Sequence, residues 1–166
     1  MTVTAVRKDL EALRLEVEAE FQATPQRVWQ LFADPRQLER WWGPPDYPAT
    51  VTAHELAIGG RVAYHMTSPE GETYPGYWIV QEVAPPHTLV FQDGFVGEDG
   101  QPDEAMPTTV TTIRISDLGA GRTRLTLTSD VPDQAAMDAL LEMGADVGIS
   151  SAMGQIDGIL AEDAAA

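Results

Sequence analysis

Strict alternation of apolar and polar side chains over residues 13–21 is the clearest pattern near the start of this chain. Glu, Leu and Ala favour helices by propensity. A period of two that runs unbroken through the whole segment nevertheless predicts a half-buried antiparallel strand. Its inner face carries Leu13, Leu15, Val17, Ala19 and Phe21, and its outer face carries Arg14, Glu16, Glu18 and Glu20.

Two short helices are predicted directly after this strand. Thr24 can cap the first, and Pro25 suits the first helical position because an N–H there would have no helical partner. Asp34 and Pro35 repeat this start signal for a second helix. The Gly-Pro-Pro run at residues 43–45 then ends it.

Apolar and β-branched runs separated by turn signals follow, which predicts six further strands. The segment 96–107 between the fourth and fifth of these is acidic and rich in turn formers, so we expect a mobile loop. Such a loop could act as a lid, hinged by Gly94, Gly97 and Gly100. The six strands are predicted at residues 49–58, 61–66, 77–83, 88–95, 109–116 and 122–129.

The last segment, residues 133–163, has apolar side chains at helical spacings of three and four. Asp130 or Asp133 can cap its start. Glycines at positions 144, 148, 154 and 158 each cost about 1 kcal/mol relative to alanine in a helix interior. We expect one long helix over this range, with Gly144, Gly148 and Ala152 on one face because they lie four residues apart.

These elements predict an α+β fold. A seven-stranded antiparallel sheet beside one long amphipathic helix buries both apolar faces if the sheet curves around the helix. The length of 166 residues suits a single domain over residues 1–166.

Composition excludes several classes of function. The sequence has no cysteine, so disulfides, thiolate metal sites and thiol catalysis are excluded. A formal net charge of −16 repels phosphate backbones and anionic lipid surfaces, so neither nucleic acid nor membrane is an expected partner. The N-terminus lacks the apolar core of a signal peptide, and no apolar run reaches membrane-spanning length, so we expect a cytoplasmic protein without membrane insertion.

Motifs for catalysis or metal binding are weak. His54 and Glu55 begin like the zinc motif H-E-x-x-H, but Ile58 stands where the second histidine belongs. His65 should face away from the long helix, and His87 lies in a Pro-Pro turn. No nucleophile elbow, phosphate-binding loop or EF-hand loop occurs. We therefore expect no catalytic residue, no metal and no cofactor.

Several sequence stretches together resemble one protein family. They are "TPQRVWQLFADPRQLERWWGP", "ELAIGGRVAYHM", "GYWIVQEVAPPHTLVFQDGF" and "MGADVGISSAMGQIDGIL". This set resembles the activator of Hsp90 ATPase homologue 1-like branch of the START/Bet v 1-like (SRPBCC, polyketide cyclase-like) helix-grip superfamily. The resemblance covers about residues 12–161. It implies two short helices after the first strand, a long C-terminal helix across the concave face of the sheet, and a cavity between the two.

In that fold, bulky side chains of the sheet face the small residues of the long helix. Such a pairing is compatible either with close contact or with a hollow. Of the adjacent pair Trp41 and Trp42, we expect one in the core and Trp42 nearer the entrance. The expected ligand-binding residues are Trp41, Trp42, Tyr64, Met66, Tyr74, Trp78, Phe91, Phe95, Met106, Met137, Met143, Gly144, Gly148, Ala152 and Gln155.

Three functions are compatible with these observations. The first is binding of a small hydrophobic or aromatic molecule in the cavity, by a monomer or homodimer. The second is a cyclase- or hydrolase-type enzyme that uses the same cavity. A buried carboxylate with a raised pKa would support it, but the sequence does not place Glu82 inside. The third, suggested by the family's description, is a chaperone activator.

Overall fold

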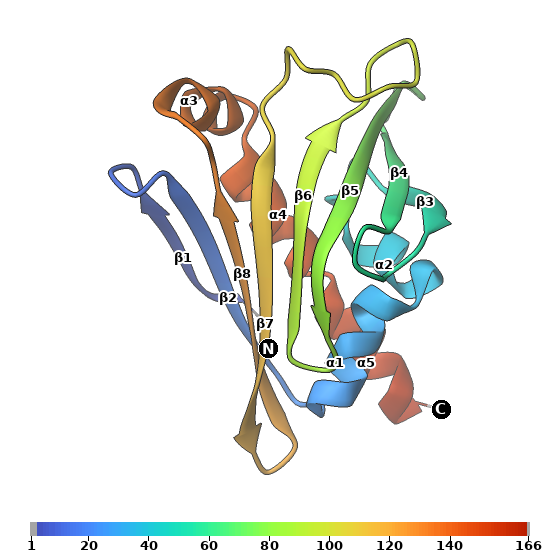
Figure 1. Cartoon of the computed structure of the whole chain (residues 1–166). Helices are drawn as coiled ribbons and strands as arrows, with labels where there is room; N and C mark the ends of the chain where they lie inside the picture. The colour runs from blue at the N-terminus through green and yellow to red at the C-terminus, as the bar shows by residue number, and fades with distance from the viewer. Residues whose placement is uncertain (1–2, 166) are drawn as a thin grey trace.

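The computed structural model describes residues 3–165 and contains one antiparallel sheet of eight strands in the order β1-β2-β8-β7-β6-β5-β4-β3. Figure 1 shows this curved sheet with the C-terminal helical segments running across one face. The α+β helix-grip architecture predicted from the sequence is confirmed. The strands are β1 (Val3–Asp9), β2 (Arg14–Phe21), β3 (Ala49–His54), β4 (Arg61–Thr67), β5 (Thr73–Ala84), β6 (Thr88–Phe95), β7 (Thr109–Gly119) and β8 (Arg122–Asp130).

The strand count differs from the predicted seven because β1 precedes the first predicted strand. It pairs with β2 at the edge of the sheet. Most of its side chains are exposed, Val6 among them with 46% of its surface accessible. An edge strand with little burial shows no clear alternation of apolar and polar residues, so the pattern did not reveal it.

Helices α1 (Pro25–Ala33) and α2 (Pro35–Trp41) begin where the sequence predicts. The Thr24 hydroxyl accepts a 3.2 Å hydrogen bond from the N–H of Arg27, which caps α1. Asp34 Oδ1 accepts a 2.9 Å hydrogen bond from the N–H of Arg36, which caps α2. Side-chain acceptors thus satisfy amide groups that would otherwise lack partners at the two helix starts.

The C-terminal helix is interrupted, unlike the single helix expected over residues 133–163. It consists of α3 (Gln134–Glu142), α4 (Ala145–Met153) and α5 (Ile156–Ala165), and Asp133 caps its start. Gly144 has φ of +76°, in the left-handed region, which a right-handed helix cannot include. A second break follows α4 at Gly154. Two of the four glycines counted as a cost, Gly144 and Gly154, therefore lie at the breaks, whereas Gly148 and Gly158 lie within α4 and α5.

The buried core lies on the concave face of the sheet. Alternate residues of β2 point into it, and Leu15, Val17, Ala19 and Phe21 are each at most 2% exposed. This confirms the predicted alternation from Leu15 to Phe21, but Leu13, expected on the same face, lies in the turn before β2 with φ of +57°. Trp78 on β5 and Phe91 on β6 stack with ring centroids 3.8 Å apart, deep in the same core.

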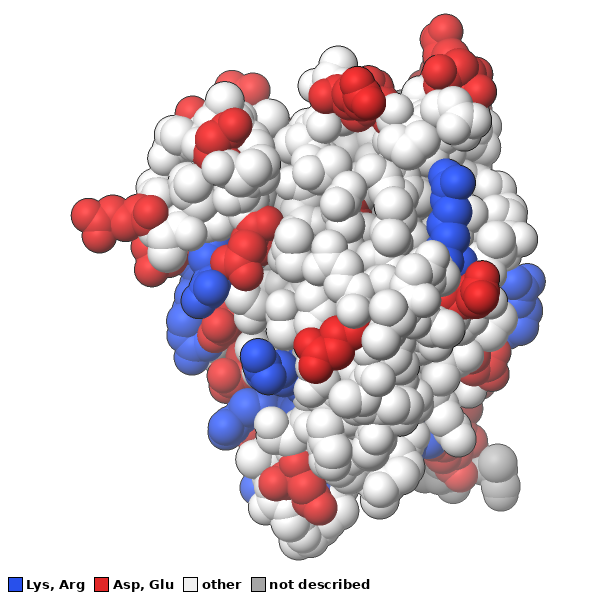
Figure 2. Space-filling model, viewed as in Figure 1, with Lys and Arg blue, Asp and Glu red and all other residues white. Residues whose placement is uncertain are grey.

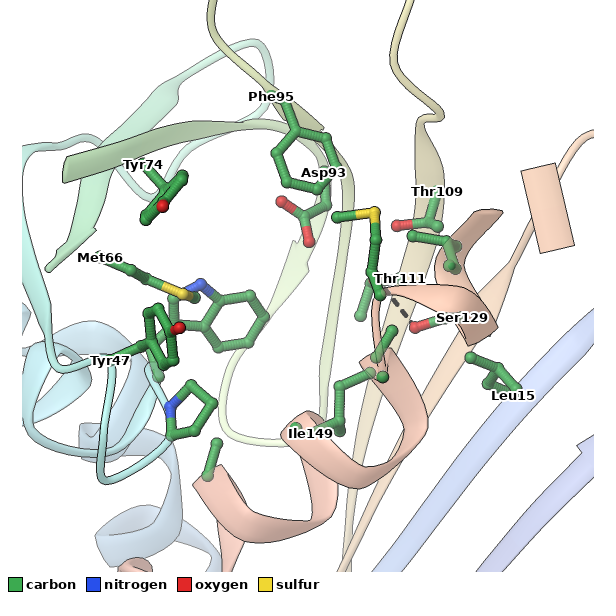
Figure 3. Close-up of a pocket in the computed structure, with 18 of the residues that line it drawn as sticks. Leu15, Tyr47, Met66, Tyr74, Asp93, Phe95, Thr109, Thr111, Ser129 and Ile149 are labelled. Carbon is green, nitrogen blue, oxygen red and sulfur yellow. Dashed lines mark hydrogen bonds between the residues drawn. The ribbon is translucent and has the colours of Figure 1, made fainter. Parts of the chain in front are cut away.

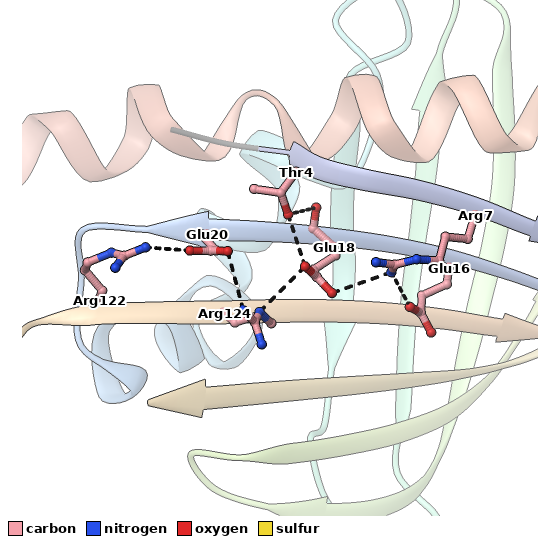
Figure 4. A network of polar contacts seen from close by, with 7 residues as sticks. All are labelled: Thr4, Arg7, Glu16, Glu18, Glu20, Arg122 and Arg124. Carbon is pink, nitrogen blue, oxygen red and sulfur yellow. Dashed lines mark hydrogen bonds and ion pairs between the residues drawn. The ribbon is translucent and has the colours of Figure 1, made fainter. Parts of the chain in front are cut away.

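The outer face of β1, β2 and β8 carries a line of ion pairs (Figure 4). Arg7 contacts Glu16 at 2.7 Å, and Arg122 contacts Glu20 at 2.6 Å. Arg124 lies 3.6 Å from both Glu18 and Glu20, on the solvent side as alternation predicts. Exposed pairs of this kind contribute under about 1 kcal/mol each.

Acidic side chains dominate the surface, in line with the net charge of −16. Figure 2 shows them gathered around α3 and the loop that joins β6 to β7, while the middle of the same face is mostly uncharged. Within residues 3–165, none of the helices is long and apolar enough to cross a membrane.

Candidate binding cavity

A cavity of about 490 Å³ lies between the sheet and the C-terminal helical segments. Its walls come from the inner faces of β4, β6, β7 and β8, from the segment between α2 and β3, and from the residues around the start of α4. Figure 3 shows side chains from these elements converging on one open space.

The lining is mainly aromatic and aliphatic, with few polar groups. Six aromatic side chains take part: Trp41, Trp42, Tyr47, Tyr64, Tyr74 and Phe95. Aliphatic and methionine side chains complete most of the wall, including Leu15, Met66, Leu127, Leu140, Met143 and Ile149. Apolar walls with a small number of fixed polar groups are typical of small-molecule sites.

The main polar feature is a hydrogen-bonded pair formed by Tyr64 and Asp93. The Tyr64 hydroxyl donates to Asp93 Oδ1 over 3.0 Å. Tyr64 stands on β4 and Asp93 on β6, so the tyrosine crosses the intervening strand β5 at Gly76. A Cβ at Gly76 would lie 2.5 Å from the Tyr64 hydroxyl oxygen, so only glycine leaves room for the ring there.

The environment of Asp93 changes its acidity. Burial raises the pKa of its carboxyl from the ordinary 3.8 to about 7, although hydrogen bonds from Tyr64 and from the backbone of Gly94 oppose the shift. The accessible surface that Asp93 retains faces the cavity, where Figure 3 shows its carboxylate pointing. Burial, reinforced by the nearby Asp93 charge, also raises the pKa of the Tyr64 phenol well above 10.0.

Two hydroxyl groups form a second polar position on the opposite wall. Thr111 on β7 and Ser129 on β8 are 2% and 4% exposed, and their side-chain oxygens lie 3.5 Å apart. Figure 3 shows this pair across the open space from Tyr47 and Met66. The cavity therefore offers polar groups at two separate places on an otherwise apolar wall.

The adjacent tryptophans have different environments, as expected. Trp41 is 1% exposed, and its indole N–H donates a 2.9 Å hydrogen bond to the carbonyl of Leu31. Trp42 is half-buried, with its ring edge-on to Trp78 at a centroid distance of 4.8 Å. Its indole N–H lies near enough to the Tyr64 hydroxyl to lower the phenol's pKa, yet forms no hydrogen bond of good geometry.

The small residues of the helical segments lie at the cavity, opposite the rings. Gly144, Gly148 and Ala152 all line it. A Cβ at Gly148 would meet only Pro44, at 3.7 Å, an ordinary contact. Of the two arrangements that the sequence left open, the structure has the hollow rather than close contact at this position.

The structure brings ten of the fifteen expected ligand-binding residues together at the cavity and places five elsewhere. Trp78 and Phe91 are fully buried behind Trp42. The ten that line the cavity are Trp41, Trp42, Tyr64, Met66, Tyr74, Phe95, Met143, Gly144, Gly148 and Ala152.

The other three of those five lie at three different positions. Met137 is buried in a small cluster with Leu15 and Leu140. Met106 borders a separate depression beside α3. The Gln155 side chain donates a 2.7 Å hydrogen bond to the carbonyl of Gly43, so it joins the turn between α4 and α5 to the segment that follows α2.

Sequence reasoning missed Asp93, although a signal for it exists. Leu89, Phe91 and Asp93 alternate along one strand, and the first two are fully buried. A carboxylate in register with two core residues must face inward, because a strand turns every second side chain to the same side. Thr111 alternates with the buried Ile113 on β7, and Ser129 with the buried Leu127 on β8, so the same argument places both hydroxyls on the inner face.

The histidines and Glu82 lie outside the cavity. His54 Nε2 lies 2.9 Å from the carbonyl of Phe32, and His87 Nδ1 lies 2.9 Å from the carbonyl of Ile115. Glu82 is exposed on β5. No cluster of three or more potential metal ligands occurs in the part of the chain that the structure describes.

Comparisons with known proteins agree with the architecture. A model of the family described as activator of Hsp90 ATPase homolog 1-like protein matches residues 22–161. The crystal structure of protein Ms6760 from Mycobacterium smegmatis is 46% identical, with 95% of this chain and 96% of that chain covered and a TM-score of 0.86. A solution structure of a protein from Arthrobacter aurescens is 43% identical, with 97% and 93% covered and a TM-score of 0.93. A search of the curated proteins found no match.

Proposed function

Because this chain belongs to the family of activator of Hsp90 ATPase homolog 1-like proteins, we propose that it binds a small hydrophobic or aromatic molecule in the cavity between the sheet and α4. Members of this family often bind hydrophobic ligands. The single observation that carries the proposal is the apolar, ring-lined hollow of about 490 Å³. Its volume lies within the range of about 300–1,000 Å³ that is common for small-molecule sites.

The cost of the hollow supports the same proposal. Protein interiors are normally packed as densely as organic crystals, and an unfilled apolar space lowers stability because its lining atoms lose contacts. Gly148 leaves part of this space open, since even a Cβ there would meet only the Pro44 ring, at 3.7 Å. A ligand of matching shape would restore the missing contacts and stabilise the folded protein.

The test is calorimetric titration with a neutral aromatic probe, 2-(2-naphthyl)ethanol. The unmodified protein should bind one equivalent, and Gly148→Leu should abolish binding because its side chain enters the cavity. Gly158→Leu is the matched control, since Gly158 lies on α5 with open space around it. Equal binding by all three proteins would place the probe elsewhere and contradict the proposal.

Acid–base catalysis in the same cavity is a second candidate function. One observation favours it: a cavity carboxyl whose pKa is about 7 can accept or donate a proton near neutral pH. With 2-tetralone in deuterated buffer, Asp93 acting as a base would accelerate deuterium incorporation beside the carbonyl. An exchange rate equal to that in buffer, or unchanged in Asp93→Asn, would rule out this role for that ketone.

A further inference from the structure

We propose that the ligand of this cavity is an apolar molecule with a positively charged amine, for which Asp93 is the counter-ion. This inference rests on the proposed function and adds to it a class of ligand and a residue that selects it. The reasons are the sign of the ionisable groups around the cavity, the neutral partners of Asp93, and the aromatic rings beside it.

Every ionisable side chain that lines the cavity is an acid, which is neutral when protonated and negative when deprotonated. They are Asp93 on β6, Tyr64 on β4, Tyr74 on β5 and Tyr47 from the segment before β3. Among the described lining residues there is no lysine, arginine or histidine. A ligand carboxylate or phosphate would therefore find no counter-ion and would lie against the charge of Asp93.

The present partners of Asp93 leave its charge uncompensated. The Tyr64 hydroxyl and the Gly94 backbone N–H are neutral donors. Within residues 3–165, Asp93 takes part in none of the ion pairs formed by lysine and arginine side chains. A buried carboxylate without a cation is unfavourable, and an ammonium group that enters the cavity would supply the missing charge.

The rings around Asp93 suit the same ligand. Figure 3 shows its carboxylate facing the open space, with Phe95 beside it and Tyr47 and Tyr74 across the cavity. The faces of aromatic rings attract cations, and this attraction increases when water is excluded. The apolar part of such an amine would occupy the wall formed by Met66, Leu127 and Ile149.

Protonation of Asp93 should link amine binding to pH. The ammonium group pairs with the ionised carboxylate, so any proton on Asp93 must leave when the amine binds. With a pKa of about 7, the ionised fraction of Asp93 falls about tenfold between pH 8 and pH 6. We expect the affinity for a protonated amine to fall about tenfold over the same interval, with release of about one proton at pH 6.

Three probes of similar shape and different charge test the proposal. They are 2-(2-naphthyl)ethylamine, which is positive, 2-(2-naphthyl)ethanol, which is neutral, and the carboxylate naphthalene-2-acetate, which is negative. Calorimetric titrations at pH 8 and 0.15 M salt should give amine affinity at least about tenfold above that of the carboxylate, and above that of the alcohol. Asp93→Asn should remove the preference for the amine and keep alcohol binding. Glu82→Gln is the control, since it removes one exposed negative charge from the same acidic protein.

The outcomes separate this inference from the proposed function. If the alcohol binds but the amine shows no preference, or if Glu82→Gln removes the preference as fully as Asp93→Asn, the inference is wrong and the proposed function stands. If no probe binds, both fail. Should Asp93→Asn not fold, titrations of the unmodified protein at pH 6 and pH 8 decide: amine affinity that does not change with pH overturns the inference.

Discussion

Tyr64 and Asp93 form a hydrogen bond of 3.0 Å across a strand that lies between them. Three strands form this contact. The phenol stands on β4, the carboxylate on β6, and the phenol ring lies over Gly76 of the intervening β5. It joins two groups whose pKa values are both raised by burial. The pair thus gives the apolar cavity a defined polar position.

Stability should depend on pH through Asp93. Its pKa in the folded protein, about 7, is above the ordinary 3.8, so the folded state holds a proton that the unfolded state releases. Stability is therefore lost as pH rises from about 4 to about 7 and is constant above that range for this group. Asparagine does not titrate, so Asp93→Asn should lack this loss. The free energy of unfolding of the variant minus that of the unmodified protein should therefore increase by about 1–3 kcal/mol between pH 5 and pH 8.

Urea denaturation of both proteins at pH 5, 6, 7 and 8 measures this difference. Subtracting the two profiles removes the contribution of the many other acidic groups. Glu82→Gln serves as the control and should give a difference that does not change with pH. A flat difference for Asp93→Asn as well would mean that Asp93 has an ordinary pKa.

Gly76→Ala should disturb the Tyr64–Asp93 pair from the backbone side. The added Cβ would lie 2.5 Å from the Tyr64 hydroxyl oxygen, so the ring must move and its hydrogen bond must break. We expect a loss of about 1–3 kcal/mol of stability in chemical denaturation. The same change at Gly158, where nothing lies within 4 Å, should instead stabilise the helix by up to about 1 kcal/mol. Equal effects at the two positions would be inconsistent with a steric contact at Gly76.

Trp41→Phe should destabilise the fold through one lost donor. The indole N–H of Trp41 satisfies the carbonyl of Leu31, in the last turn of α1, where carbonyls lack helical partners. Phenylalanine would leave that carbonyl buried without a partner, at a cost of about 1–3 kcal/mol. Trp29→Phe removes a half-buried indole as the control and should cost less. A similar loss for both variants, measured by thermal denaturation, would show that ring size and not the hydrogen bond matters.

The fold was predictable because its signals are local. Alternation from Leu15 to Phe21 marks β2, and Thr24 and Asp34 mark the starts of α1 and α2. These features depend on side-chain period and on a few capping atoms, so they can be read without knowledge of the tertiary structure. There are two exceptions: β1, which shows no clear alternation, and Gly144, whose left-handed backbone divides a segment that the apolar period joins.

The candidate site was less predictable because a cavity depends on register between distant strands. Met137 and Met143 are similar in the sequence, yet the first is fully buried and the second lines the cavity. Asp93 could have been found from its alternation with Phe91, but its hydrogen bond to Tyr64 depends on the order β4-β5-β6. That order comes from pairing across the whole sheet, which no local pattern encodes.

Intermolecular nuclear Overhauser effects from 2-(2-naphthyl)ethanol to methyl-labelled methionines would show whether the molecule binds between the sheet and α4. Met66 and Met143 line the cavity, whereas Met106 and Met153 do not. A probe bound in the cavity should give contacts to the Met66 and Met143 methyl groups and none to the other two. Contacts to Met106 or Met153 without any to Met66 and Met143 would mean that the probe binds outside the cavity and that the proposed function is wrong.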